Sequence, residues 1–144
     1  MTLELLMALL CGHILGDYLF QNDWMALHKT RSGTRLFVHV CIYSICIAAC
    51  VFSALASAPL FNAIYFLLWA GLWHAALDGG NLIERWYRLI GGRAYSRIAN
   101  MPEFVSRKDA VENMARVSYT AIVQTVTDNS LHLVVLYSGA RLWL

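Results

Sequence analysis

The chain has 144 residues, of which 59% are hydrophobic and 14% charged, with a formal net charge of +2 at pH 7. Ordinary soluble domains are roughly 45–50% apolar and about 25% charged. The composition excludes a disordered chain, a collagen-like chain and a typical cytosolic enzyme. It predicts an all-α polytopic membrane protein built as a single domain, residues 1–144.

Four apolar segments are predicted to cross the membrane, and the first covers residues 2–20. The next two, 36–57 and 60–77, share a stretch without any Asp, Glu, Lys or Arg. A helix over this stretch would be about 63 Å long, enough to cross a hydrocarbon core of about 30 Å twice. Pro59 and the small residues before it predict the turn of a hairpin at 56–59. The last span is predicted at 119–142, and a short amphipathic helix at 82–90 is expected in the membrane interface.

Basic residues predict the orientation of these spans. In the four-span arrangement, ten of the eleven Lys and Arg fall in the two loops that follow spans one and three. Both loops should therefore face the cytoplasm, with both termini outside it, in a bacterial inner membrane. The basic rim is expected to attract anionic lipid head groups and no nucleic acid. A second copy or another protein in the membrane remains open as a partner.

Histidine and aspartate recur at helical spacing in three of the apolar segments. The pairs are four residues apart, which places both side chains on one helix face, and chance predicts roughly 0.35 such pairs. They are His13 with Asp17, His74 with Asp78, and Asp128 with His132. In the four-span topology these six side chains and His39 share one depth near the inner leaflet. We therefore expect all seven to converge between the helices.

Energetics favour a metal site for such a cluster. A carboxylate at the centre of a membrane helix costs about 2.5–3.5 kcal/mol, whereas a bound divalent metal can supply on the order of 10 kcal/mol. A set of imidazoles and carboxylates without thiolates favours zinc, with manganese or iron as alternatives, and seven ligands leave room for two ions with Asp bridging. The expected ligands are His13, Asp17, His39, His74, Asp78, Asp128 and His132.

Three aspartates and Gln21 are expected to have roles besides metal binding. Asp17, Asp78 and Asp128 are also the candidate catalytic residues, since one of them could act as a general base. Gln21 extends the stripe of His13 and Asp17 by one turn and could orient an imidazole. The alternative is that these polar side chains only pack and hydrogen-bond across helices.

The segment from His13 to Gln21, HILGDYLFQ, resembles the H-x-x-G-D-aromatic-x-x-Q signature of a domain-of-unknown-function family. Its members are small four-span membrane proteins of bacteria and bacteriophages. The later family positions match His39, His74 with Asp78, and Asp128 with His132. The chain departs from the family at Asn129, where Gln is usual, and after Asp78, where a basic residue is common. A more distant similarity, to LexA-regulated inner-membrane proteins thought to be metal-dependent hydrolases, implies that activity here.

The expected function is thus an integral inner-membrane protein whose intramembrane His/Asp metal site hydrolyses a lipid or phosphoester. Two alternatives remain open. The same residues could relay protons or metal ions across the membrane. The chain could also be a phage-encoded interaction protein in which a metal or polar cluster only holds the helices together.

Overall fold

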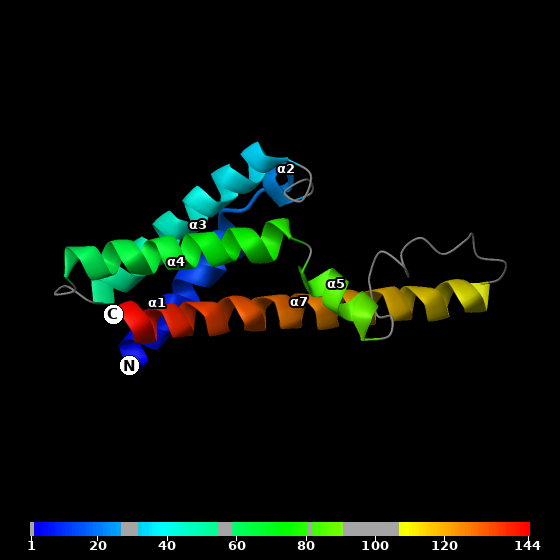
Figure 1. Cartoon of the computed structure of the whole chain (residues 1–144). Coiled ribbons are helices and arrows are strands. Elements are labelled where there is room, and N and C mark those ends of the chain that lie inside the picture. The colour runs from blue at the N-terminus through cyan, green and yellow to red at the C-terminus, as the bar shows by residue number, and fades with distance from the viewer. Residues whose placement is uncertain (1, 27–31, 55–58, 81, 91–106) are drawn as a thin grey trace. The chain divides into compact units, whose positions relative to one another are not determined.

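The computed structural model describes residues 2–26, 32–54, 59–80, 82–90 and 107–144. Every element in these ranges is helical, which confirms the predicted all-α class (Figure 1). The elements are α1 (Leu3–Ile14), the π-helical turn η1 (Leu15–Leu19), α2 (Asp23–Ala26), α3 (Gly33–Ala54), α4 (Leu60–Gly79), α5 (Leu82–Leu89) and α7 (Arg107–Trp143).

The chain divides into two compact units. The first contains Met1–Gly80 and Leu131–Leu144, and the second contains Asn81–Ser130. The long helix α7 therefore contributes its beginning to the second unit and its end to the first. Nearly all of the predicted site residues belong to the first unit.

The first unit begins with close packing of α1 on α3. The hydroxyl of Thr2 caps α1 by accepting a hydrogen bond from the Leu5 amide at 3.2 Å. A Cβ added at Gly12 would lie 3.0 Å from the Ile47 Cα, so glycine permits the two backbones to approach each other at this point. Leu5 and Leu9 of α1 then pack into the same buried core as residues of α3.

Helix α4 and the end of α7 complete this core. The Trp69 indole donates a hydrogen bond to the Val135 carbonyl at 3.0 Å, which ties the two helices together. The buried core thus draws on four helices, and its members are Leu5, Leu9, Tyr43, Ile47, Val51, Phe66, Ala70, Leu136 and Ala140.

The second unit contains α5 and the beginning of α7. The hydroxyls of Tyr87 and Thr127 lie 2.6 Å apart and join these two helices. Arg88 forms an exposed ion pair with Glu84 at 2.7 Å, one turn away on α5. The helix predicted at 82–90 is therefore confirmed as α5, and its place in a membrane interface stays a prediction.

The prediction of four membrane spans is wrong. Only α3 and α4, among the described residues, are long and apolar enough to cross a membrane. In the segment predicted as 2–20, the α-helix ends at Ile14 after 12 residues, which is about 18 Å at 1.5 Å per residue. The segment predicted as 119–142 lies within α7, where polar side chains such as Asp128, His132 and Arg141 interrupt the apolar sequence.

The predicted orientation no longer follows, because it depended on placing the basic residues in the two loops after spans one and three of a four-span protein. Arg35, predicted to lie in a loop, is in the first turn of α3 and donates a hydrogen bond to the Trp24 carbonyl at 3.2 Å. Arg116 lies within α7. The predicted turn at 56–58 and the basic residues Lys29, Arg31, Arg93 and Arg97 are outside the described residues.

Candidate metal centre

The π-helical turn η1 brings Asp17 to the centre of the first unit. A π-turn inserts one extra residue into a helical path and changes the direction of the side chains that follow. Gly16, in this turn, is buried against α3, and a Cβ there would lie 2.8 Å from Tyr43 Cδ2. The small residue at 16 therefore lets the turn approach α3, where its neighbour Asp17 meets the histidines.

The other central residues come from α3 and α4. His39 lies in the second turn of α3, and His74 and Asp78 lie one turn apart at the end of α4. Because α3 and α4 follow each other in the chain and pack together, the start of one lies beside the end of the other (Figure 1). This connection explains why residues more than thirty positions apart meet.

Four donor atoms converge, one each from Asp17, His39, His74 and Asp78, and all lie within 4.8 Å of one another. The Nε2 atoms of His39 and His74 are 2.8 Å apart. Asp17 Oδ1 lies 3.2 Å from the first of these nitrogens and 3.3 Å from the second. Asp78 Oδ2 lies 3.0 Å and 3.4 Å from the same two atoms. We call these four residues the central quartet.

The two imidazole nitrogens of the quartet form a hydrogen bond, whereas one oxygen of Asp17 does not form any. Asp17 Oδ1 is buried and has no hydrogen-bond partner, although two imidazole nitrogens lie 3.2–3.3 Å away. Close approach without hydrogen-bond geometry means that the donor and acceptor directions do not point along the line between the atoms. A buried polar atom of this kind is rare and calls for an explanation, such as a bound ion.

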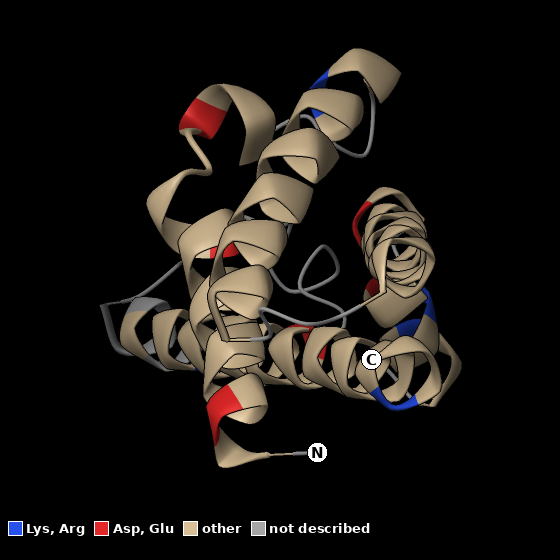
Figure 2. Cartoon of the chain, turned by 90° about the vertical axis from the view of Figure 1, so that its left-hand side faces the viewer, with Lys and Arg blue, Asp and Glu red and all other residues tan. Residues whose placement is uncertain are grey.

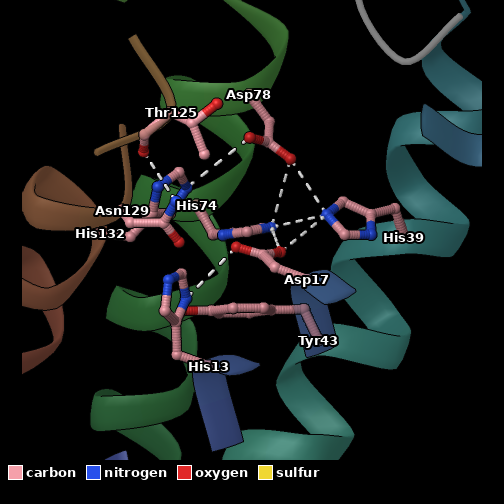
Figure 3. A network of polar contacts seen from close by, with 9 residues as sticks. All are labelled: His13, Asp17, His39, Tyr43, His74, Asp78, Thr125, Asn129 and His132. Carbon is pink, nitrogen blue, oxygen red and sulfur yellow. Dashed lines mark hydrogen bonds and ion pairs between the residues drawn. The ribbon is translucent and has the colours of Figure 1, made fainter. Parts of the chain in front are cut away.

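Two more of the expected ligands, His13 and His132, lie beside the quartet (Figure 3). His13 Nδ1 lies 3.2 Å from Asp17 Oδ2, and His132 Nε2 lies 3.7 Å from Asp78 Oδ1. The imidazole rings of His13 and His132 stack with centroids 5.5 Å apart. Six of the seven side chains that were expected to converge are thus close together, and their role as metal ligands stays a prediction.

The remaining predictions concern Asp128 and Gln21. Asp128 is half-buried on α7, four residues before His132, and lies in the second unit. Gln21 is half-buried just beyond the end of η1. Roles for both residues stay predictions.

Tyr43 belongs to the site and was missed in the sequence. Its ring is fully buried and lies parallel to the His74 ring at a centroid distance of 3.6 Å. Its hydroxyl is 3.4 Å from His13 Nδ1. The available signal was its position four residues after His39, on the same face of α3.

The electrostatics of Asp17 favour its carboxylate form. Burial alone would raise the pKa of Asp17, but contact with the His39 imidazole and the charges of His74 and His13 outweigh this effect. The pKa of Asp17 therefore lies below its ordinary value, and the side chain is a carboxylate at neutral pH. A carboxylate flanked by imidazoles is a donor set suited to a divalent transition metal.

Comparison with curated proteins and with solved structures finds no match to this chain. A family model covers most of it, from residue 5 to residue 138, and so includes every residue of the site. This result agrees with the similarity of the His13–Gln21 segment to an uncharacterised family. The chain belongs to the family described as "Protein of unknown function (DUF3307)".

Proposed function

We propose that this protein binds a divalent metal ion through the central quartet. The observation that carries the proposal is the convergence of two imidazole nitrogens and two carboxylate oxygens within 4.8 Å. All four side chains are buried or nearly so, with exposed fractions from 0% for His39 to 12% for Asp17. Burying two carboxylates is costly unless they are paired or bind a metal.

The spacing of the donor atoms fits a metal ion. Ligands at about 2.0–2.1 Å from zinc are separated by about 3.3 Å in a tetrahedron, by simple geometry. Five separations between donor atoms of the quartet range from 2.8 Å to 3.4 Å.

The donor types narrow the choice of metal. Imidazole and carboxylate without thiolate suit zinc, manganese or ferrous iron. The four cysteines, Cys11, Cys41, Cys46 and Cys50, are free, and none of them belongs to a group of described residues that could hold a metal ion. We propose zinc as the first candidate, with manganese and iron as alternatives.

We further propose that α3 and α4 cross a membrane as a hairpin. Only 28% of the most apolar window of α3 and 22% of that of α4 is buried, whereas a core helix of a soluble protein is buried over most of its surface. The large apolar side chains that remain exposed, such as Phe37, Ile45, Leu68 and Leu72, would contact lipid.

Hydrolysis of a lipid or phosphoester is the activity we propose for the bound ion. Structural zinc sites are usually rich in Cys, whereas His and carboxylate ligands are typical of catalytic sites. Such an ion lowers the pKa of bound water and polarises a phosphoryl or acyl oxygen. Asp17 is the most exposed member of the quartet, so water and substrate would approach from its side.

Metal content tests the first proposal. The detergent-purified full chain is stripped with a chelator, dialysed against zinc or manganese, and analysed for bound metal. We expect near-stoichiometric metal in the wild type and loss of it in His39→Ala/His74→Ala. Asp23→Asn, an exposed carboxylate on α2, is the matched control and should retain the metal. A metal-free wild type after dialysis would refute the proposal.

Turnover tests the second proposal separately. The metal-loaded protein in lipid vesicles is assayed for release of phosphate or fatty acid from phospholipids and lipid phosphates. We expect activity that chelation abolishes and added metal restores, and that Asp17→Asn removes. Full metal occupancy without turnover on this panel would contradict hydrolysis and leave metal binding as a structural property.

A further inference from the structure

We infer that the exposed aromatic side chains that follow Asp17 lie in the head-group layer of the membrane, so that the substrate of the central quartet is a lipid that stays in the bilayer. This inference rests on the proposed function, because it takes the quartet as the hydrolytic site and α3 and α4 as spans. It goes further by naming the substrate class and the surface through which the substrate arrives.

Large apolar side chains are exposed directly after Asp17 in the chain. Tyr18, Leu19, Phe20 and Trp24 have exposed fractions between 48% and 67%. Grouped exposed apolar side chains mark surfaces that bind proteins or membranes. Three of the four are aromatic, and Trp and Tyr in particular are enriched where a membrane meets water. We call Tyr18, Phe20 and Trp24 the aromatic edge.

Contacts with α3 fix the position of Trp24. Helix α2 packs against α3 (Figure 1), and Met25, next to Trp24, is buried. Arg35 donates its hydrogen bond to the Trp24 carbonyl, and its guanidinium carbon lies 5.1 Å from the centroid of the Trp24 ring in a cation–π contact. Since Arg35 is in the first turn of a proposed span, the Trp24 indole lies at the level where that span begins.

The quartet lies only slightly deeper than this level. His39 follows Arg35 by four residues on α3, which is about 6 Å along the helix axis. The head-group layer on each side of a bilayer is about 5–7 Å thick. The quartet is therefore near the boundary between head groups and hydrocarbon, where a phospholipid has its phosphate and ester linkages. A lipid could present these linkages to the quartet without leaving the bilayer.

The charged groups at this surface also suit lipid head groups. The Arg35 guanidinium has five N–H donors, more than its contact with the Trp24 carbonyl requires, and guanidinium groups bind phosphate well. Asp23, at the start of α2, is exposed and would remain in water. Trp and Arg are also common at the centres of protein interfaces, so a protein partner is the competing occupant. The two occupants differ in what the Trp24 indole contacts.

Fluorescence quenching locates Trp24 without any need for activity. The full chain and Trp24→Phe are reconstituted in vesicles of phosphatidylglycerol and phosphatidylethanolamine, and the difference between their emissions isolates the Trp24 indole. Lipids brominated close to the glycerol test contact with the interface, and iodide tests contact with water. We expect the brominated lipids to quench the Trp24 emission. Quenching by iodide alone would place Trp24 in water, and quenching by neither would mean that protein covers it; both results would overturn the inference.

Turnover tests the substrate class. Metal-loaded Phe20→Ser/Trp24→Ser is compared with the wild type on a long-chain phospholipid in vesicles and on a short-chain analogue in solution. The ratio of vesicle to solution turnover should fall about tenfold, because the variant loses the transfer of aromatic side chains into the interface. Phe61→Ser is the matched control, since it removes an exposed aromatic side chain from the first turn of α4, at the other end of the hairpin. It should keep the wild-type ratio.

Metal content separates the possible failures. Both variants should bind metal as the wild type does, because neither changes the quartet. An unchanged ratio in metal-loaded Phe20→Ser/Trp24→Ser would overturn the assignment of a bilayer lipid as substrate. Metal-loaded wild type without turnover on either substrate would refute the proposed hydrolysis and the substrate class with it, while quenching still decides where the aromatic edge lies. If the double variant fails to fold, Phe20→Ser alone is measured by the same criterion.

Discussion

Tyr43 is the residue that connects the two sides of the proposed site. Its ring stacks on His74 of the quartet, and its hydroxyl contacts His13, which faces Asp17. The parallel stacking holds the His74 ring in one plane, so that Nε2 faces the carboxylates. We therefore assign Tyr43 a positioning role with two separable parts, one for the ring and one for the hydroxyl.

Substitution of Tyr43 should separate these parts. Tyr43→Phe keeps the stacked ring and removes one hydrogen-bonding group, worth about 0.5–1.5 kcal/mol. Because His13 faces the Asp17 carboxylate of the quartet, the affinity for the metal ion should fall about two- to tenfold. Tyr43→Leu also removes the aromatic contact with His74 and should weaken metal binding further. Competition with a metal indicator measures the affinity of each variant, and equal affinities in the wild type and both variants would contradict the positioning role.

At the residue scale, the sequence indicated which side chains pair because helix geometry is regular. Residues four apart on a helix share a face, so their spacing alone pairs His74 with Asp78. His39 joins this pair because α3 and α4 form a hairpin, which places the start of α3 beside the end of α4. Tyr43 was missed because an aromatic residue in an apolar segment is usually a core residue. Which oxygen of Asp17 or Asp78 faces which histidine depends on side-chain rotamers. The spacing of residues in the sequence does not determine these rotamers.

At the element scale, glycines on one face of the first helical segment set how closely it approaches α3. Gly12 and Gly16 are four residues apart, and an added Cβ would meet Ile47 at the first position and Tyr43 at the second. Small residues at this spacing allow close contact of two helices. The sequence shows this pattern, but it does not show that Gly16 and Asp17 lie in a π-turn, since no residue pattern distinguishes that turn from an ordinary α-helical one.

Gly16→Ala should therefore disturb both packing and the site. The new Cβ would lie 2.8 Å from Tyr43 Cδ2 and 3.0 Å from its Cα, so η1 or α3 must shift. Overpacking of this kind typically costs about 1–3 kcal/mol, and the shift should also weaken metal binding through the neighbouring Asp17. Denaturant titration followed by circular dichroism measures the free energy of unfolding. Gly33→Ala is the matched control, because a Cβ at that position has no atom within 4 Å. Equal stabilities of the two variants would contradict the packing argument.

At the scale of the whole molecule, the number of spans changes the energetics of the site. Four membrane helices would hold the carboxylates within the bilayer, where each would be costly. Asp78 is the last residue but one of α4, and His39 is in the second turn of α3, the two helices proposed as spans. Asp17 lies outside both spans, in η1. The cluster therefore lies toward one end of the hairpin, where carboxylates cost less than at the bilayer centre.

The distribution of charge agrees with this arrangement. Arg35, in the first turn, is the sole Lys, Arg, Asp or Glu of α3, and Asp78 is the sole one of α4. Figure 2 shows long tan stretches of helix with few coloured residues. The middle of each helix is therefore without charge, and the charged residues that occur are close to one end of the hairpin.

A lysine in the middle of α3 tests whether this surface contacts lipid. Ile45 lies near the centre of the helix and is 67% exposed. In a soluble protein an exposed Ile→Lys substitution changes stability by no more than about 0.5 kcal/mol. In a membrane span the same change costs about 2.5–3.5 kcal/mol at the helix centre. We therefore expect Ile45→Lys to reduce sharply the fraction of the protein that resists alkaline extraction from membranes.

Leu89→Lys, at a position 79% exposed at the end of α5 and outside both proposed spans, should leave that fraction nearly unchanged. Equal behaviour of the two variants would mean that α3 does not cross the membrane, because a position exposed to water and one exposed to lipid cannot tolerate a charge equally.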